Sequence, residues 1–213
     1  MSTREASLPK GLVAAVLALT VAVLGLGGAI LVIKLKPAEL PTTATDRTIE
    51  VWRQVVAKAP EDDHARVGLG LALLEAGRPD EARGEFEEAV RLNEENWVAL
   101  MQLGLLIEGE QPERTQELLS DAATFAPVGD KVAPLVYLGD LMMGQGDLKA
   151  AKKAYARAVG DSEIAYDAHL GLARALEALG DDEGALVEYQ EAARFNPSDP
   201  ELIETIDRLS SDK

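Results

Sequence analysis

The chain has 213 residues, enough for one domain with extensions or for two small domains. Hydrophobic residues make up 47% of it, which argues against extended disorder, and the absence of Cys excludes disulfide scaffolds, thiolate metal sites and cysteine nucleophiles. The formal net charge is −16, so the basic surface of a nucleic-acid-binding protein is missing and we expect no nucleic-acid partner. Aromatic residues are only 4%, so Leu, Ala and Val must form the core, which favours packed helices.

The first feature along the chain is an apolar run. After an N-terminal tail, residues 1–10, residues 11–33 contain no charged side chain over 23 positions. A helix of that length measures about 34 Å, enough to cross a hydrocarbon core of about 30 Å. A cleaved signal peptide has a shorter apolar region, and this run is followed by Lys34, Leu35 and Lys36. We therefore predict an uncleaved, single-pass transmembrane helix that anchors the protein in the cell (inner) membrane.

Two further features of the span concern its packing and its orientation. Positive charges on the two sides nearly balance, so we follow the precedent of short-tailed signal anchors and expect the following domain on the periplasmic or extracytoplasmic side. Small residues share one helix face, which predicts close approach of a second transmembrane helix, although Ala is also common apolar filler. These residues are Ala14, Ala18, Ala22, Gly25 and Ala29.

Residues 34–47 are expected to form a linker, because they contain Pro37, Pro41 and several Thr but no apolar periodicity. From residue 48 onward the chain carries 34 acidic and 16 basic side chains, a net charge of −18. An anionic lipid surface would repel this domain, so we expect it to stand off the membrane.

An internal repeat of about 34 residues organises the rest of the chain. The pair Leu69-Gly70 recurs three times at intervals of 34, 35 and 34 residues, the last time as Leu172-Ala173. Downstream, Ala82, Phe86 and Ala89 recur as Ala151, Tyr155 and Ala158 and as Ala185, Tyr189 and Ala192. Between the two halves stands a Gly followed by polar residues that can start a second helix, at Gly77, Gly146 and Gly180. Each period therefore predicts a helix, a turn and a helix.

These residues resemble the tetratricopeptide repeat family, whose signature of Leu-Gly, a Gly turn, Ala, an aromatic residue, Ala and a closing Pro is matched in order. The second unit is the most divergent, because Thr115 and Leu119 replace the Ala and the aromatic residue and its turn lacks the Gly. The resemblance covers residues 48–209. It divides them into a half repeat, 48–62, four repeats, 63–96, 97–129, 132–165 and 166–199, and a capping helix, 199–209, before a tail, 210–213.

The resemblance implies an all-α solenoid, a right-handed superhelix with a concave groove. Phe86, Tyr155 and Tyr189 then fill the space beside small residues and belong to the core. The family's geometry places a further set of side chains on the concave face, apolar at the N-terminal end and charged at the C-terminal end. These groove residues are Val67, Leu71, Leu74, Met101, Leu105, Val136, Asp140, Met143, Leu170, Arg174 and Glu177.

No residue pattern indicates catalysis, a cofactor or a metal site. His64 and His169 belong to no two-histidine motif and lack a neighbouring nucleophile. The acidic clusters at residues 61–63 and 181–183 fall at helix starts, so capping is a better explanation than calcium binding. We expect a protein that is not an enzyme.

The sequence therefore predicts a non-catalytic, membrane-anchored scaffold or adaptor that binds protein partners, as a peptide or helix, in the groove. An alternative is a dedicated assembly factor for an envelope complex, resembling the membrane-anchored repeat proteins of c-type cytochrome maturation or of pilus and envelope biogenesis. The groove residues could instead only pack the solenoid, or meet a second copy of it in a homo-oligomer.

Overall fold

The computed structural model describes residues 43–162 and 164–211. Thr45–Lys213 forms one compact unit. The predicted membrane span at residues 11–33 and its stripe of small residues lie outside the described residues, within which no helix is long and apolar enough to cross a membrane. The described ranges hold ten helices: α2 (Ala44–Lys58), α3 (Asp63–Glu75), α4 (Pro79–Leu92), α5 (Trp97–Ile107), α6 (Pro112–Phe125), α7 (Val132–Gly144), α8 (Leu148–Asp161), α9 (Tyr166–Ala178), α10 (Asp182–Ala193) and α11 (Pro200–Ser211).

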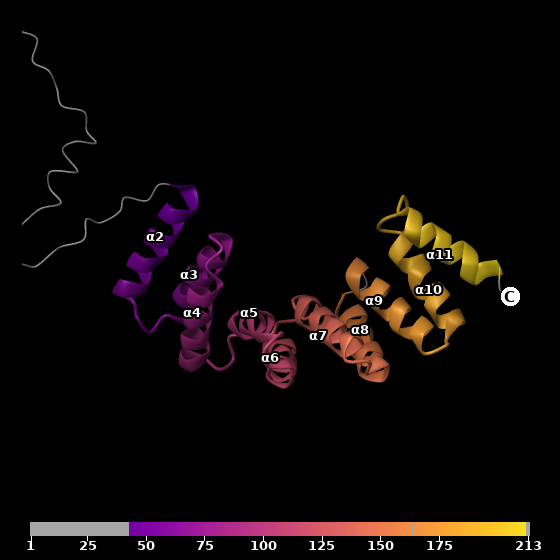
Figure 1. The fold of residues 1–213 in the computed structure, drawn as a ribbon, viewed down its shortest axis with the longest axis horizontal. Helices are drawn as coiled ribbons and strands as arrows, with labels where there is room; N and C mark the ends of the chain where they lie inside the picture. The colour runs from indigo at the N-terminus through magenta and orange to yellow at the C-terminus, as the bar shows by residue number, and fades with distance from the viewer. Residues whose placement is uncertain (1–42, 163, 212–213) are drawn as a thin grey trace, which may run out of the picture. The chain divides into compact units, whose positions relative to one another are not determined.

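The helices pair into four antiparallel hairpins, α3 with α4, α5 with α6, α7 with α8, and α9 with α10. Each hairpin packs against the next, and Figure 1 shows them side by side along a curved row. In hairpin α5–α6, α5 lies on the inner side of the curve and α6 on the outer side. The prediction of an all-α solenoid of helix-turn-helix units is therefore confirmed for the described residues.

Turns and caps explain where the helices end. Gly77, Gly146 and Gly180 close three of the four hairpins with φ between 69° and 79°, a backbone conformation that side chains disfavour. The side chains of Asp62 and Asp181 accept hydrogen bonds from Ala65 N and Gly184 N at 3.0 Å. The capping role predicted for these two acidic clusters is thereby confirmed.

The repeated aromatic residues lie in the core, as predicted. Phe86 is fully buried, and Tyr155 and Tyr189 retain at most 5% exposure. In the divergent second repeat, Thr115 is also fully buried, and its hydroxyl donates a hydrogen bond to the carbonyl oxygen of Gly104 at 3.1 Å. This bond satisfies the buried hydroxyl, which explains how a polar residue replaces Ala at this position.

The N-terminal boundary differs from the prediction. Helix α2 begins at Ala44, four residues before the predicted start at Thr48, so the end of the predicted linker is helical. Asp46 lies in the first turn, where its negative charge is favourable, and this turn needs no apolar periodicity to form. In α2, Ile49 is buried, and Trp52 packs so closely on α3 that a Cβ at Gly68 would lie 2.7 Å from its ring.

Candidate functional site

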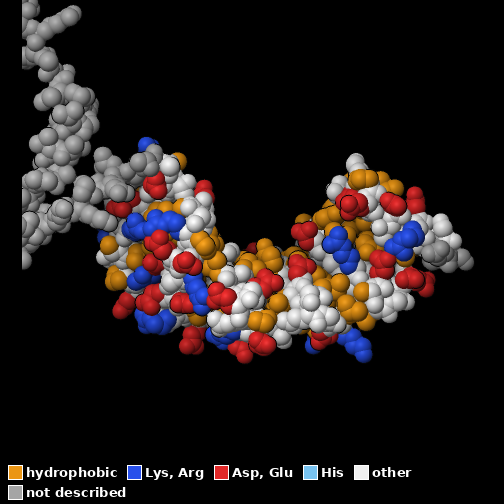
Figure 2. All heavy atoms as spheres, in the orientation of Figure 1, with side chains coloured by type: hydrophobic (Ala, Val, Ile, Leu, Met, Phe, Trp, Pro, Cys, Tyr) orange, Lys and Arg blue, Asp and Glu red, His pale blue; other side chains and the backbone are white. Residues whose placement is uncertain are grey.

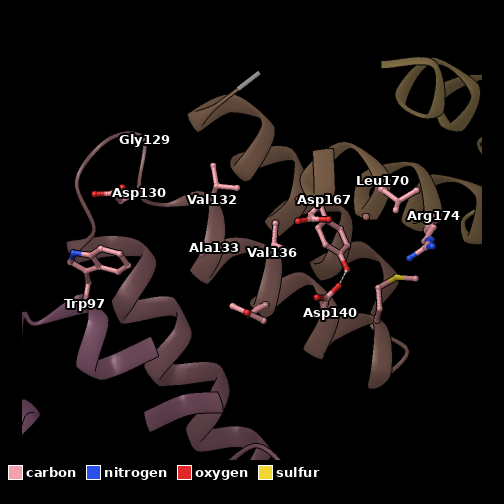
Figure 3. A pocket seen from close by; sticks show the side chains of 14 residues that line it. Trp97, Gly129, Asp130, Val132, Ala133, Val136, Asp140, Asp167, Leu170 and Arg174 are labelled. Atoms are coloured by element: carbon pink, nitrogen blue, oxygen red, sulfur yellow. Dashed lines mark hydrogen bonds between the residues drawn. The ribbon is translucent and has the colours of Figure 1, made fainter. Parts of the chain in front are cut away.

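A pocket of about 640 Å³ lies between the first helices of three consecutive repeats. Figure 2 shows that the repeats form a hollowed surface on the inner side of the curve. Figure 3 shows Trp97 of α5 at one end, Val136 of α7 in the middle and Arg174 of α9 at the other end. The complete lining is Trp97, Gly129, Asp130, Val132, Ala133, Val136, Tyr137, Asp140, Met143, Tyr155, Asp167, Leu170, Gly171 and Arg174.

The spacing of residues along α7 and α9 creates the lining. Val132, Val136, Asp140 and Met143 follow one another at four- and three-residue steps, so they share one face of α7. Asp167, Leu170 and Arg174 do the same on α9. The walls are therefore apolar with a few charged groups, the composition expected of a site that binds an organic ligand or a peptide.

The polar groups of the pocket are held in place by defined contacts. The Tyr155 hydroxyl, which comes from α8 beneath the pocket, donates a hydrogen bond to Asp140 Oδ1 at 2.6 Å, as Figure 3 shows. Burial, and then this bond to Asp140, raise the pKa of Tyr155, so the phenol stays protonated. Asp140 therefore presents a carboxylate at a fixed position, while the exposed Arg174 supplies the positive charge of the lining.

The loop before α7 brings an acidic residue into the pocket. Asp161 Oδ2 accepts hydrogen bonds from the backbone N–H groups of Gly129 at 2.9 Å and Lys131 at 3.1 Å. Gly129 has a φ of 94°, which permits the tight turn. These two bonds flank Asp130 and hold it over the end of the pocket near Trp97, as Figure 3 shows. The lining thus carries three Asp and one Arg, a net charge of −2.

Five of the predicted groove residues line this pocket together: Val136, Asp140, Met143, Leu170 and Arg174. The N-terminal members lie elsewhere. Val67 and Met101 are only 8% exposed and pack in the core, so they offer little surface to a partner. Leu74 and Leu105 are half-buried against that core, whereas Leu71 is exposed. This pocket therefore lies nearer the C-terminal end than the apolar part of the predicted groove.

Glu177 serves a different role from the one predicted. Its carboxylate accepts hydrogen bonds from the Tyr189 hydroxyl at 2.7 Å and from Arg208 of α11. The hydrogen bond from Tyr189 is the main cause of the lowered pKa of Glu177. Partial burial raises this pKa, and the bond from Arg208 lowers it further. This carboxylate therefore joins α9 to α10 and α11 and does not line the pocket.

Sequence reasoning did not identify Trp97, Asp130, Tyr137, Tyr155 and Asp167 as site residues. Trp97 and Tyr137 carried a signal, because large aromatic residues are rare in this chain and occupy first helices there. Asp130 also carried one, because it lies in the two-residue insertion between the second and third repeats. Tyr155 was assigned to the core, and in addition its hydroxyl bonds to Asp140 of the pocket.

The fold and the pocket define a class of protein: a helical-repeat solenoid with a hollowed inner surface. The tetratricopeptide repeat profile matches residues 45–105 and 138–200. The chain belongs to the tetratricopeptide repeat family. No curated protein sequence matches it.

Solved structures share the fold at low sequence identity. MamA is 19% identical with a TM-score of 0.60, over 70% of this chain and 81% of that one. YrrB, described as a TPR protein with an unusual peptide-binding site, is 15% identical with a TM-score of 0.66, over 76% of this chain and 84% of that one. PilF of Pseudomonas aeruginosa is 18% identical with a TM-score of 0.70, over 78% and 76%. At these identities the likeness establishes the fold alone.

Proposed function

We propose that the protein is a non-catalytic scaffold that binds a protein partner, as a short peptide or a helix, in the pocket between α5, α7 and α9. The observation that carries this proposal is the combination of a 640 Å³ hollow, apolar walls and fixed charged groups on one inner surface. A peptide-binding site is also what the description of YrrB names for that protein, which supports the same use of the fold.

The pocket has the residue types that dominate protein interfaces. Trp97 and Tyr137 offer large aromatic surfaces, and Tyr137 is 41% exposed. Central apolar and aromatic contacts supply most of the affinity of an interface, whereas charges at its edge mainly orient the partner. We therefore expect a partner with one or two apolar anchors against Val136 and Tyr137, a basic residue towards Asp130 or Asp140, and an acidic one towards Arg174.

We also propose that residues 11–33 hold this scaffold in the inner membrane, with the repeats outside the cytoplasm. Support comes from the 23 uncharged positions of that segment. The net charge of −18 on residues 48–213 would keep the repeats away from anionic lipid, leaving the pocket accessible to a partner.

A selection from a displayed random-peptide library tests the binding function. Peptides selected on the full-length chain should bind the Tyr137→Asp variant at least about tenfold more weakly than the wild type, because the variant places a charge in the apolar wall. Phe125→Asp is the matched control, since Phe125 is an aromatic residue with the same 41% exposure and lies outside the pocket lining. Equal binding to wild type and Tyr137→Asp, or a loss with the control alone, would place binding elsewhere.

A further inference from the structure

The outer face of α8 differs in charge from the outer faces of the other second helices. Buried residues fix the alignment, because Ala151, Tyr155 and Ala158 of α8 correspond to Thr115, Leu119 and Ala122 of α6. Three outward positions at four-residue steps, exposed in α6 and α8 and partly buried at Glu88 and Glu191, can then be compared across the four repeats. They hold Asp80, Gly84 and Glu88 in α4, Glu113, Glu117 and Asp121 in α6, Lys149, Lys153 and Arg157 in α8, and Glu183, Val187 and Glu191 in α10.

Only α8 carries cations at these positions, in a domain whose net charge is strongly negative. We call Lys149, Lys153 and Arg157 the basic row, and Glu113, Glu117 and Asp121 the acidic row. All six side chains belong to exposed residues. Within residues 43–162 and 164–211, no carboxylate forms an ion pair with the basic row, whereas Glu117 pairs with Arg114 of its own helix at 2.7 Å.

A groove of about 170 Å³ separates the two rows. Leu138 and Met142 of α7 form its floor, and the small Ala150 and Ala154 of α8 leave that floor open. Lys153 and Arg157 stand on one wall. The other wall, from α6, is lined by Gln116 and Ser120, and Glu117 and Asp121 border the adjoining hollow.

We propose that this groove is the contact surface for a second copy of the chain. In a stack of helix-turn-helix repeats the second helices run in the same direction, so the alignment places the charged residues of α6 and α8 at corresponding levels. A two-fold axis parallel to both helices would therefore place α6 of each copy over α8 of the other. It would bring Glu117 of one copy opposite Lys153 of the second copy, and repeat that pair by symmetry.

Charge complementarity favours a second copy over an unrelated acidic partner. An acidic partner would explain the basic row alone, whereas a second copy uses both rows, in matching register, at the same time. Each exposed ion pair contributes little by itself, so the rows determine how two copies meet more than how tightly they bind. This surface lies on the outer helices and is separate from the pocket, so it does not depend on the proposed peptide binding.

A charge-swap experiment on the full-length chain tests the proposal. Two differently tagged copies are co-expressed, extracted in a mild detergent and retrieved through one tag, and the amount of the other copy is measured. Lys153→Glu and Glu117→Lys should each weaken self-association by about tenfold, because each change acts twice in a symmetric pair. When the two variants are mixed with each other, both central pairs regain opposite charges, and association should return to the wild-type level.

Two of the variants distinguish a specific contact from general charge repulsion between copies. Glu117→Lys makes the chain less negative, so general repulsion would predict stronger association for this variant, the opposite of our expectation. Lys58→Glu, an exposed residue of α2, changes the net charge as Lys153→Glu does and should have no effect. Three results would each overturn the proposal. They are no recovery of association when the two variants are mixed, weaker association with Lys153→Glu but not with Glu117→Lys, and no self-association of the wild type.

Discussion

Tyr155 of α8 lies so close to Gly139 of α7 that a Cβ added to Gly139 would meet the tyrosine ring at 2.5 Å. The ring also contacts Gly171 of α9, so one aromatic side chain packs against the first helices of two consecutive repeats. Tyr155 therefore has two roles. Its ring sets the spacing of α7 and α9, and its hydroxyl holds Asp140 in the pocket.

We predict that Gly139→Ala destabilises the domain by about 1–3 kcal/mol, because the added methyl group overpacks a buried contact with a rigid ring. Gly104→Ala is the matched control. It occupies the corresponding position of the second repeat, where Leu119 replaces the aromatic residue and the nearest atoms would lie 3.5 Å from the new Cβ. Gly104→Ala should be neutral or stabilising by up to about 1 kcal/mol, since Ala favours a helix. Thermal unfolding followed by circular dichroism measures both, and equal effects would refute the packing argument.

The Glu177 carboxyl predicts a dependence of stability on pH. Its pKa is lowered from 4.5, mainly by Tyr189 and then by Arg208. Because the folded carboxyl binds a proton less readily than the unfolded one, its contribution is present above about pH 4.5 and is lost as the pH falls through the folded pKa. Glu177→Gln should therefore cost about 1 kcal/mol near neutral pH and progressively less in acid. Melting temperatures of wild type and variant that differ equally at pH 7 and pH 3 would contradict this role.

Arg174 should influence which peptides enter the pocket more than how much apolar surface they bury. Arg174→Glu removes the one cation of the lining, so libraries selected on this variant should be enriched in Lys and Arg relative to the wild type. Binding of acidic wild-type peptides should weaken, and the difference should shrink with added salt, because exposed charges are screened within about 8–10 Å at ordinary ionic strength. Titrations at two salt concentrations, with Lys58→Glu as the control, measure this. An unchanged peptide preference would exclude Arg174 from recognition.

The absence of native Cys permits a direct test of topology. Ser210 of α11 is exposed, so a Ser210→Cys variant should be accessible to a thiol reagent. If the repeats lie outside the cytoplasm, a reagent that cannot cross the inner membrane should label this variant in intact cells or spheroplasts. Labelling that requires lysis would place the repeats in the cytoplasm instead.

The sequence was sufficient to predict the repeats because their signals are local. A Gly with positive φ closes the turn, and buried Ala and aromatic residues follow at helical spacing, so Gly77, Phe86 and Tyr155 were assigned correctly. Each of these signals depends on a few residues within one hairpin. Neighbouring hairpins then only repeat the same packing.

The exact surface could not be predicted, because it depends on contacts between repeats. Helix α5 is apolar nearly all round, so its sequence does not tell which side neighbours cover, and Met101 proved buried. Asp130 reaches the pocket through an insertion whose path is set by Asp161, about 30 residues later at the end of α8. The family's geometry placed Glu177 in the groove, and no local signal indicated its bond to Arg208, which lies 31 residues away on a helix outside the repeats.

The central claim is that a partner binds in the pocket between α5, α7 and α9, and site-specific photo-crosslinking in living cells tests it most directly. A photoreactive phenylalanine analogue is placed at Tyr137, inside the pocket, and at Phe125, which has the same exposure outside it. We predict a discrete crosslinked adduct from position 137, suppressed when a peptide selected on the wild-type chain is co-expressed in excess, and no such adduct from position 125. Crosslinking from position 125 but not 137, or an adduct at 137 that the peptide does not suppress, would contradict the claim.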